Sequence, residues 1–329
     1  MKQGTGNLEP GKRWRIALGA VVAAVALWLA ARGTSLDALR AAMSSARIEW
    51  VFLAIASVIL TVAAGVIRWR LLFFPDAHNR SWSTLAAASI VGQTLNIVLP
   101  IRLGEVARAG WVSRAERLPI GQVGGTIAVE KLADLVTTGV VVSVLLVLAA
   151  VPGWLAAPGR ALIGTGAVAI AVMVLVSLRG KALAAAGDRL AGLLPAAIGT
   201  PLHRLFVTAL EGTRVLESWR ITSAVGILSV IVLMLAASTN YLMFFAFDLE
   251  VPAAAAVVLL IALQVGNTIV SVPGNVGVFQ YVAVLTLGAY SVEPDVAFAY
   301  AVLLHIVALG PKILGGALLL PFAPRAAAG

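Results

Sequence analysis

The sequence predicts an all-α integral membrane protein with about six full transmembrane helices and two re-entrant hairpins. Composition is the first observation: 60% of the 329 residues are apolar, only 12% are charged and the mean hydropathy is +0.99. Soluble domains carry about a quarter charged residues, so this chain has too few charges to cover a water-facing surface. The other two observations are a series of long uncharged runs and an uneven placement of Lys and Arg between them.

The apolar runs define the expected elements in order, since a spanning helix needs about 20 mostly apolar residues. Run 16–31 follows the basic cluster Lys12-Arg13-Trp14-Arg15 and is either a retained helix or a cleaved signal peptide. Two uncharged stretches, 81–101 and 251–292, end at or contain proline and glycine and predict re-entrant hairpins. The other runs that predict full spans are 51–67, 132–151, 161–178, 221–247 and 296–320.

The positions of Lys and Arg decide which runs cross the membrane. Suppose that each hairpin returns to the side of the membrane from which it entered. Then 18 of the 24 basic residues lie on the same side, as the positive-inside rule expects of cytoplasmic loops. The prediction is a multi-pass protein of the bacterial inner membrane with both termini in the cytoplasm. Its single membrane domain, residues 1–329, divides into repeats at about 14–151 and 158–321 that form an inverted-repeat arrangement.

Two smaller features predict packing at the cytoplasmic side. Residues 181–219 carry leucines near helical spacing among arginines, which predicts one or two amphipathic helices on the inner leaflet, split around Pro195 to Pro201. A solvated linker between the repeats is the alternative, and both interpretations stay open. Gly121 and Gly125 lie four residues apart and predict close helix packing.

Several functions are excluded by what the sequence lacks. Without cysteine the chain has no disulfide, no Cys-ligated zinc and no thiol nucleophile. Its three histidines, His78, His203 and His305, are scattered and predict no metal site. No Walker loop or hydrolase motif is present, so we expect neither a cofactor nor enzymatic activity. The net charge of +9 reports membrane orientation and does not predict nucleic-acid binding.

The first candidate site lies where the first hairpin ends. Pro100 is expected to stop the incoming segment, so that a helix begins near Gly104 with Glu105 in its first turn. Free N–H groups at such a helix start, flanked by arginines, would accept a phosphate or carboxylate head group. Alternatively, Pro and Gly shape a turn while the arginines sit at the water interface. The head-group candidates here are Asn96, Arg102, Gly104, Glu105 and Arg108.

The second candidate site is Glu130-Lys131-Leu-Ala-Asp134. Glu130 and Asp134 share a helix face, and charges within a membrane must pair, face a wet cavity or snorkel to the interface. They are candidates for charge balance or proton coupling. Lys312 in the last run is either their counter-charge or a lysine that snorkels to the surface.

The third candidate site is the break in the second hairpin. Pro273, Gly274 and Gly277 are expected to unwind the helix, which leaves Asn275 and Gln280 to hydrogen-bond a head group. A simple kinked helix is the alternative.

On these blocks the chain resembles the flippase-like family typified by the transmembrane part of lysylphosphatidylglycerol synthase, which also includes hopanoid-associated membrane proteins. The resemblance covers about Trp14 to Pro321. It implies movement of a lipid between leaflets through a cavity between inverted repeats. Lys131 stands where the family usually has arginine, and Gln280 lies near a position that is often acidic. Only four residues follow Arg325, so we expect no fused aminoacyl-transfer domain and no synthesis of lysyl lipid by this chain.

The leading hypothesis is therefore a lipid flippase-like transporter. Its partners would be membrane lipids, which include phospholipid, aminoacyl-phospholipid, hopanoid and polyprenyl lipid. The first alternative is a non-transporting partner of a lipid or glycan biosynthesis enzyme, with 181–219 as its docking surface. The second is a membrane-embedded enzyme that acts on a polyprenyl-linked sugar, with Glu130 or Asp134 as base.

Overall fold

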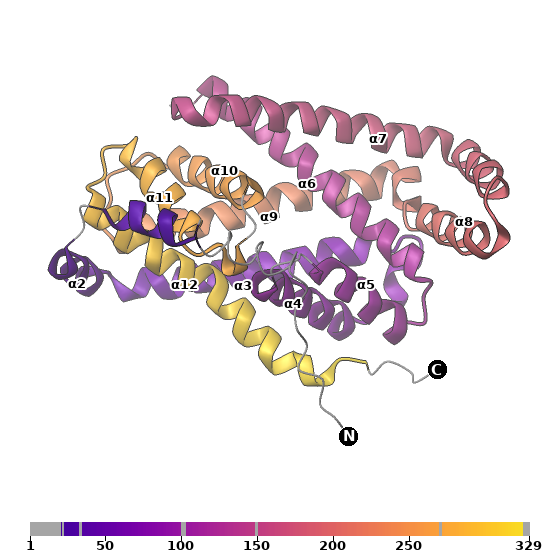
Figure 1. Cartoon of the computed structure of the whole chain (residues 1–329), viewed down its shortest axis with the longest axis horizontal. Coiled ribbons are helices and arrows are strands. Elements are labelled where there is room, and N and C mark those ends of the chain that lie inside the picture. Colours follow the sequence, from indigo (N-terminus) through magenta and orange to yellow (C-terminus); the bar gives the residue numbers. More distant parts are fainter. Residues whose placement is uncertain are drawn as a thin grey trace.

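The computed structural model describes residues 21, 23–32, 35–99, 103–148, 151–269 and 272–324 and is all-helical within that part (Figure 1). Five of its helices are long and apolar enough to cross a membrane, so the predicted all-α membrane fold is confirmed. These are α3 (Ile48–Leu71), α6 (Ile120–Leu148), α7 (Gly153–Gly192), α9 (Trp219–Ala246) and α12 (Pro294–Leu319). Residues 23–31 are helical too, but the first part of the predicted run 16–31 lies outside the described residues.

Two pairs of shorter helices form hairpins. The second pair lies within the predicted stretch 251–292, but in the first a single helix fills the predicted stretch 81–101 and its partner follows it, so that prediction ended too early. The first pair is α4 (Trp82–Val98) and α5 (Gly104–Ala115), and the second is α10 (Ala254–Ile269) and α11 (Val278–Gly288). At 1.5 Å per residue the longest of them, α4, measures about 25 Å, less than the hydrocarbon thickness of about 30 Å. None of the four is therefore long enough to cross a membrane alone.

Both pairs close in the same register around a glycine. A Cβ atom on Gly92 would lie 2.9 Å from the carbonyl oxygen of Gly104 and 3.1 Å from the Cβ of Arg108. One on Gly266 would lie 2.8 Å from Val282 and 3.7 Å from Val278. In each pair the glycine thus meets the residues twelve and sixteen positions further along. Equal register is expected of duplicated halves, whereas their opposite orientation stays a prediction.

The segment 181–219 contains two helical stretches, as predicted. Residue Arg179 (φ −122°, ψ 15°) is non-helical and divides α7 by a kink, so that the part from about 180 to Gly192 is a separate helical stretch ahead of the next helix. The separation comes at Leu193–Pro195, and Pro201 lies inside α8 (Ala196–Glu211), so the predicted split extended too far. Proline fits the first turn of a helix, where no N–H partner is needed, and Pro195 directly precedes that turn.

Helix α8 packs on the start of α6, in agreement with the predicted role of Gly121 and Gly125. A Cβ atom on Gly121 would lie 2.5 Å from the carbonyl oxygen of Leu205, and one on Gly125 would lie 3.0 Å from the Cα of Gly212. Only glycine permits this approach. Figure 1 shows α8 folded back beneath one end of α7, which runs along the outer edge of the molecule.

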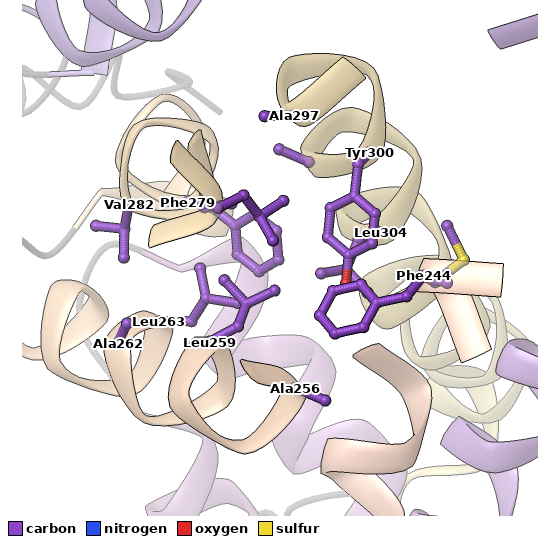
Figure 2. Packing of buried hydrophobic residues seen from close by; sticks show 14 of the residues in the cluster. Phe244, Ala256, Leu259, Ala262, Leu263, Phe279, Val282, Ala297, Tyr300 and Leu304 are labelled. Atoms are coloured by element: carbon purple, nitrogen blue, oxygen red, sulfur yellow. The ribbon is translucent and has the colours of Figure 1, made fainter. Parts of the chain in front are cut away.

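The largest hydrophobic core lies where α9, α10, α11 and α12 meet (Figure 2). Phe244 of α9 and Tyr300 of α12 have their ring centroids 5.5 Å apart, and both are essentially inaccessible. The Tyr300 hydroxyl donates to the carbonyl oxygen of Asn240, whose side-chain amide donates to that of Ala256. A second core surrounds Trp69 and joins α3, α4, α5 and α6. The remaining elements are α2 (Leu36–Ser45), η1 (Ala77–Asn79), η2 (Arg214–Glu217), η3 (Pro273–Asn275) and η4 (Leu320–Phe322).

Candidate functional site

Glu130 of α6 lies at the centre of a buried charge network. Its Oε1 accepts a hydrogen bond of 3.0 Å from Arg68 of α3, and its Oε2 accepts one of 2.7 Å from Arg108 of α5. The three residues are only 3–8% exposed. Buried charges need such pairing, since removing one partner leaves an uncompensated charge. Glu130 is therefore paired inside the protein, which was one of the alternatives for it, and its side chain does not extend to the protein surface.

Arg68 extends the network to a second carboxylate. One of its terminal nitrogens lies 2.5 Å from Oδ1 of Asp134 and also donates to the Ser229 hydroxyl at 3.0 Å. Arg68 was not among the predicted site residues, because an arginine at the end of an apolar run is expected in the cytoplasm. The available signal was indirect: two carboxylates four residues apart within a span require a buried cation from another helix.

Trp69 fixes Arg108 from the other side. The guanidinium carbon of Arg108 lies 3.5 Å from the centroid of the Trp69 ring, a cation–π contact, and the indole N–H donates to the Thr126 hydroxyl. Cation–π contacts contribute about 2 kcal/mol when they are desolvated. Arg108 is thus held by Trp69, which directly follows Arg68 in α3.

A more accessible ion pair lies beside this network. Nζ of Lys131 is 3.1 Å from Oε1 of Glu105, and Oε2 of Glu105 is 3.6 Å from Arg108. The Lys131 side chain is 52% exposed and that of Glu105 34%. As predicted, α5 begins at Gly104 with Glu105 in its first turn, but the Gly104 N–H already donates to Oδ1 of Asn96 at 2.7 Å.

These charges line a cavity of about 340 Å³, which we call the polar cavity. It lies among α3, α4, α5, α6, α9 and α12. Its polar lining residues are Thr61, Arg68, Ser89, Gln93, Asn96, Glu105, Arg108, Glu130, Lys131 and Lys312. A volume of this size falls in the range of small-molecule sites.

A second cavity of about 400 Å³ joins the two hairpins. Asn96 and Glu105 reach it from the first hairpin, and Gly274 and Asn275 reach it from the second. Asn96, Glu105 and Lys131 line both this cavity and the polar cavity. The structure therefore brings the first two candidate sites together with Asn275 of the third. A smaller cavity of about 230 Å³ on the other side of Arg68 is lined by Asp134, Ser229 and Gln264, among others.

Lys312 lines the polar cavity, but it is not the counter-charge of Glu130 or Asp134. Those carboxylates pair with Arg68 and Arg108. Within the described residues no carboxylate lies within 4 Å of the Lys312 ammonium, which makes that part of the prediction wrong. The carbonyl oxygen of Lys312 accepts a 2.6 Å hydrogen bond from Thr94, which ties α12 to α4.

Gln280 does not line either polar cavity, although the sequence suggested it as a head-group ligand. It is 5% exposed, and its Oε1 accepts from the Gly277 N–H while its Nε2 pairs with Nδ1 of His305 at 2.7 Å. The other His305 nitrogen pairs with the Gly274 carbonyl oxygen at 2.8 Å. Gln280 and His305 thus brace the turn from Pro273 to Gly277, where Gly274 (φ 64°) and Gly277 (φ 84°) adopt left-handed backbone conformations.

Two predicted residues, Pro100 and Arg102, lie outside the described residues. In the part of the chain that the structure covers, no group of three or more His, Asp and Glu residues could hold a metal ion. The arrangement offers fixed guanidinium groups, one half-exposed lysine and several amides within a membrane-embedded cavity. Such donors suit an oxyanion-bearing head group.

Comparison with known families gives one match. The family model described as "Lysylphosphatidylglycerol synthase TM region" matches residues 16–316. No curated protein matches the chain.

Proposed function

The chain belongs to the family of the lysylphosphatidylglycerol synthase transmembrane region, and from this premise we propose that it moves an anionic or polar-headed lipid between the leaflets of the bacterial inner membrane. The observation that carries the proposal is the polar cavity, which holds four cationic side chains within a molecule of long apolar helices. A lipid head group crosses a bilayer slowly because hydrocarbon cannot replace its water. A cavity of fixed charges and amides supplies that replacement.

The mechanism follows from which elements line the cavity. Helices α4 and α5 carry Asn96, Glu105 and Arg108, while η3 carries Asn275 on the opposite wall of the adjoining cavity. Neither hairpin spans the membrane, so each can tilt without disturbing a full transmembrane helix. The network of Arg68, Glu130 and Arg108 keeps the head-group cations in place during such a movement. Glu130 and Asp134 balance charge within this network.

The direct test is lipid translocation in proteoliposomes, read as the leaflet accessibility of labelled anionic and neutral lipids. The wild type is expected to move a labelled lipid, and Lys131→Gln and Arg108→Gln are expected to slow it at least about tenfold. Lys131 is half exposed, so its removal leaves no deeply buried partner unpaired. Arg47→Gln is the matched control, since Arg47 pairs with Glu49 on the surface, away from the polar cavity.

Each outcome separates the proposal from its rivals, provided that every variant shows a normal thermal unfolding profile. If a known scramblase works in the same vesicles and the wild type moves no lipid, transport is rejected. The partner hypothesis then predicts that changes on the exposed face of α8 abolish co-purification with a lipid-synthesis enzyme. The enzyme hypothesis instead predicts product formation that Asp134→Asn abolishes, since Asp134 is the other candidate base and its side chain is 40% exposed. Transport that survives both cavity variants would place the site elsewhere.

A further inference from the structure

The polar cavity adjoins an apolar groove at one edge. The groove has a volume of about 510 Å³ and lies between α3, α4 and α12. Its lining is formed by Val58, Ile59, Val62, Ala63, Val66, Ile67, Trp82, Ala86, Ile90, Pro311 and Lys312. Val62, Val66 and Lys312 also line the polar cavity, so they mark the junction between the two. The polar cavity and the adjoining apolar groove match the polar head group and the apolar acyl chains of a lipid.

A charge count restricts the head group. The network contains the cations Arg68, Arg108, Lys131 and Lys312 and the carboxylates of Glu105, Glu130 and Asp134. Every one of these carboxylates has a cationic partner within 4 Å, and all of those partners are among the first three cations. Four cations against three carboxylates leave one positive charge, and Lys312 is the cation without a partner among the described residues.

Four buried polar atoms of residues that line the polar cavity also lack hydrogen-bond partners within the described part of the chain. Three are donors in residues at least nine-tenths buried: the hydroxyl of Ser89, Nε of Arg68 and Nε of Arg108. The fourth, Oε2 of Glu105, is an acceptor that lies 3.6 Å from the Arg108 guanidinium. A buried donor without a partner is unfavourable, and an oxygen-rich ligand would satisfy it. The unpaired ammonium and these three donors thus favour an anion with several oxygen atoms.

We propose that the transported lipid has a net charge of −1, carried by a single phosphodiester, with its phosphate against Lys312 and an acyl chain in the groove of α3, α4 and α12. The inference rests on the proposed function. One negative charge neutralises the network, whereas a second phosphate charge would leave an excess of negative charge. A lipid with an added ammonium group would meet carboxylates that are already paired. The occupant of the groove is an acyl chain because the groove lining, apart from Lys312, is apolar and opens at the same junction.

Lipid binding by the purified full chain tests the inference without any transport. Native mass spectrometry would compare dioleoyl-phosphatidylglycerol (one negative charge) with dioleoyl-phosphatidylcholine (no net charge) and lysyl-phosphatidylglycerol (net positive). The wild type is expected to retain phosphatidylglycerol at least about tenfold better than either competitor. Lys312→Gln is expected to remove this preference and Lys312→Arg to keep it. Lys181→Gln, at an exposed position of α7, is the matched control.

The groove has its own variant pair, in case Lys312→Gln fails to fold. Ala63→Trp fills the groove and is expected to weaken retention of phosphatidylglycerol, whereas Ala56→Trp, two turns earlier on the exposed face of α3, leaves it unchanged. Equal retention of the three lipids by the wild type, or an unchanged preference in folded Lys312→Gln, overturns the inference. Selective binding without translocation would instead refute the proposed function alone, and translocation without head-group preference would refute the inference alone.

Discussion

The carboxylate of Glu130 joins three helices. It receives hydrogen bonds from Arg68 of α3 and Arg108 of α5, which lie on opposite sides of it. Without its charge, the two guanidinium groups would face each other in a buried site with only Asp134 and Glu105 to offset them. Glu130 therefore contributes to stability because it neutralises the two buried guanidinium groups, in addition to accepting their hydrogen bonds.

We expect Glu130→Gln to destabilise the folded protein by about 3–5 kcal/mol, because two buried cations lose their shared partner. The measurement is thermal unfolding in detergent, followed by tryptophan fluorescence. Glu49→Gln is the matched control: its pair with Arg47 is more than half exposed, and such pairs contribute at most about 1 kcal/mol. Equal shifts for both variants would contradict a structural role of the buried network.

At the residue scale, sequence reasoning identified the charges but not all of their partners. The cost of a charge within a membrane singled out Glu130 and Asp134 and required that they pair, face a wet cavity or snorkel to the interface. Which cation pairs with them depends on how α3 lies against α6, and that crossing is a long-range property of the fold. Arg68 was therefore missed, and of the two alternatives for Lys312 the counter-charge to Glu130 or Asp134 is not found in the described part of the chain.

At the scale of elements, the contact of α8 with α6 depends on glycine. Gly125 lets the end of α8 approach so closely that a Cβ atom there would overlap the carbonyl oxygen of Ala209. The adjacent Gly124 has no heavy atom within 4 Å of its own Cβ position. The two glycines therefore form a matched pair on one helix.

We expect Gly125→Leu to displace α8, because overpacking a tight contact costs about 1–3 kcal/mol. The measurement is hydrogen exchange of the backbone amides of residues 196–211, which should accelerate about tenfold or more. Gly124→Leu is expected to leave that exchange unchanged. If the two variants protect α8 equally, the contact seen in the structure does not hold this helix in place.

The boundaries of elements were predicted with uneven success. Hydropathy located the five long helices, since apolar runs of spanning length are their direct cause. It misjudged where two of them begin: α6 begins at Ile120, twelve residues before the predicted run, and α7 begins at Gly153, eight residues before its run, whereas the predicted end at 178 coincides with the kink at Arg179. Helical hydrogen bonding continues through Glu130 and Lys131 because partners on α3 and α5 neutralise these charges.

At the scale of the whole molecule, the two hairpins decide the topology. Each consists of helices too short to span, and each closes on a glycine in the same register, at Gly92 and Gly266. The sequence suggested this relation through the proline and glycine residues that end or break the uncharged stretches 81–101 and 251–292. The similarity of the two hairpins does not reveal on which side of the membrane each of them opens. The distribution of Lys and Arg predicts opposite sides.

Thiol labelling tests that prediction cleanly, because the chain contains no cysteine of its own. Single cysteines at His78 and Arg114 flank the first hairpin, and those at Glu250 and Glu293 flank the second; all four positions are exposed. In intact cells, a membrane-impermeant maleimide is expected to label positions 250 and 293 only, and positions 78 and 114 should react after the membrane is opened. Opposite behaviour of 78 and 114 would mean that α4 crosses the membrane. Labelling of all four positions from one side would mean that the halves are not inverted. The two hairpins could not then open the cavity to opposite sides of the membrane when they tilt.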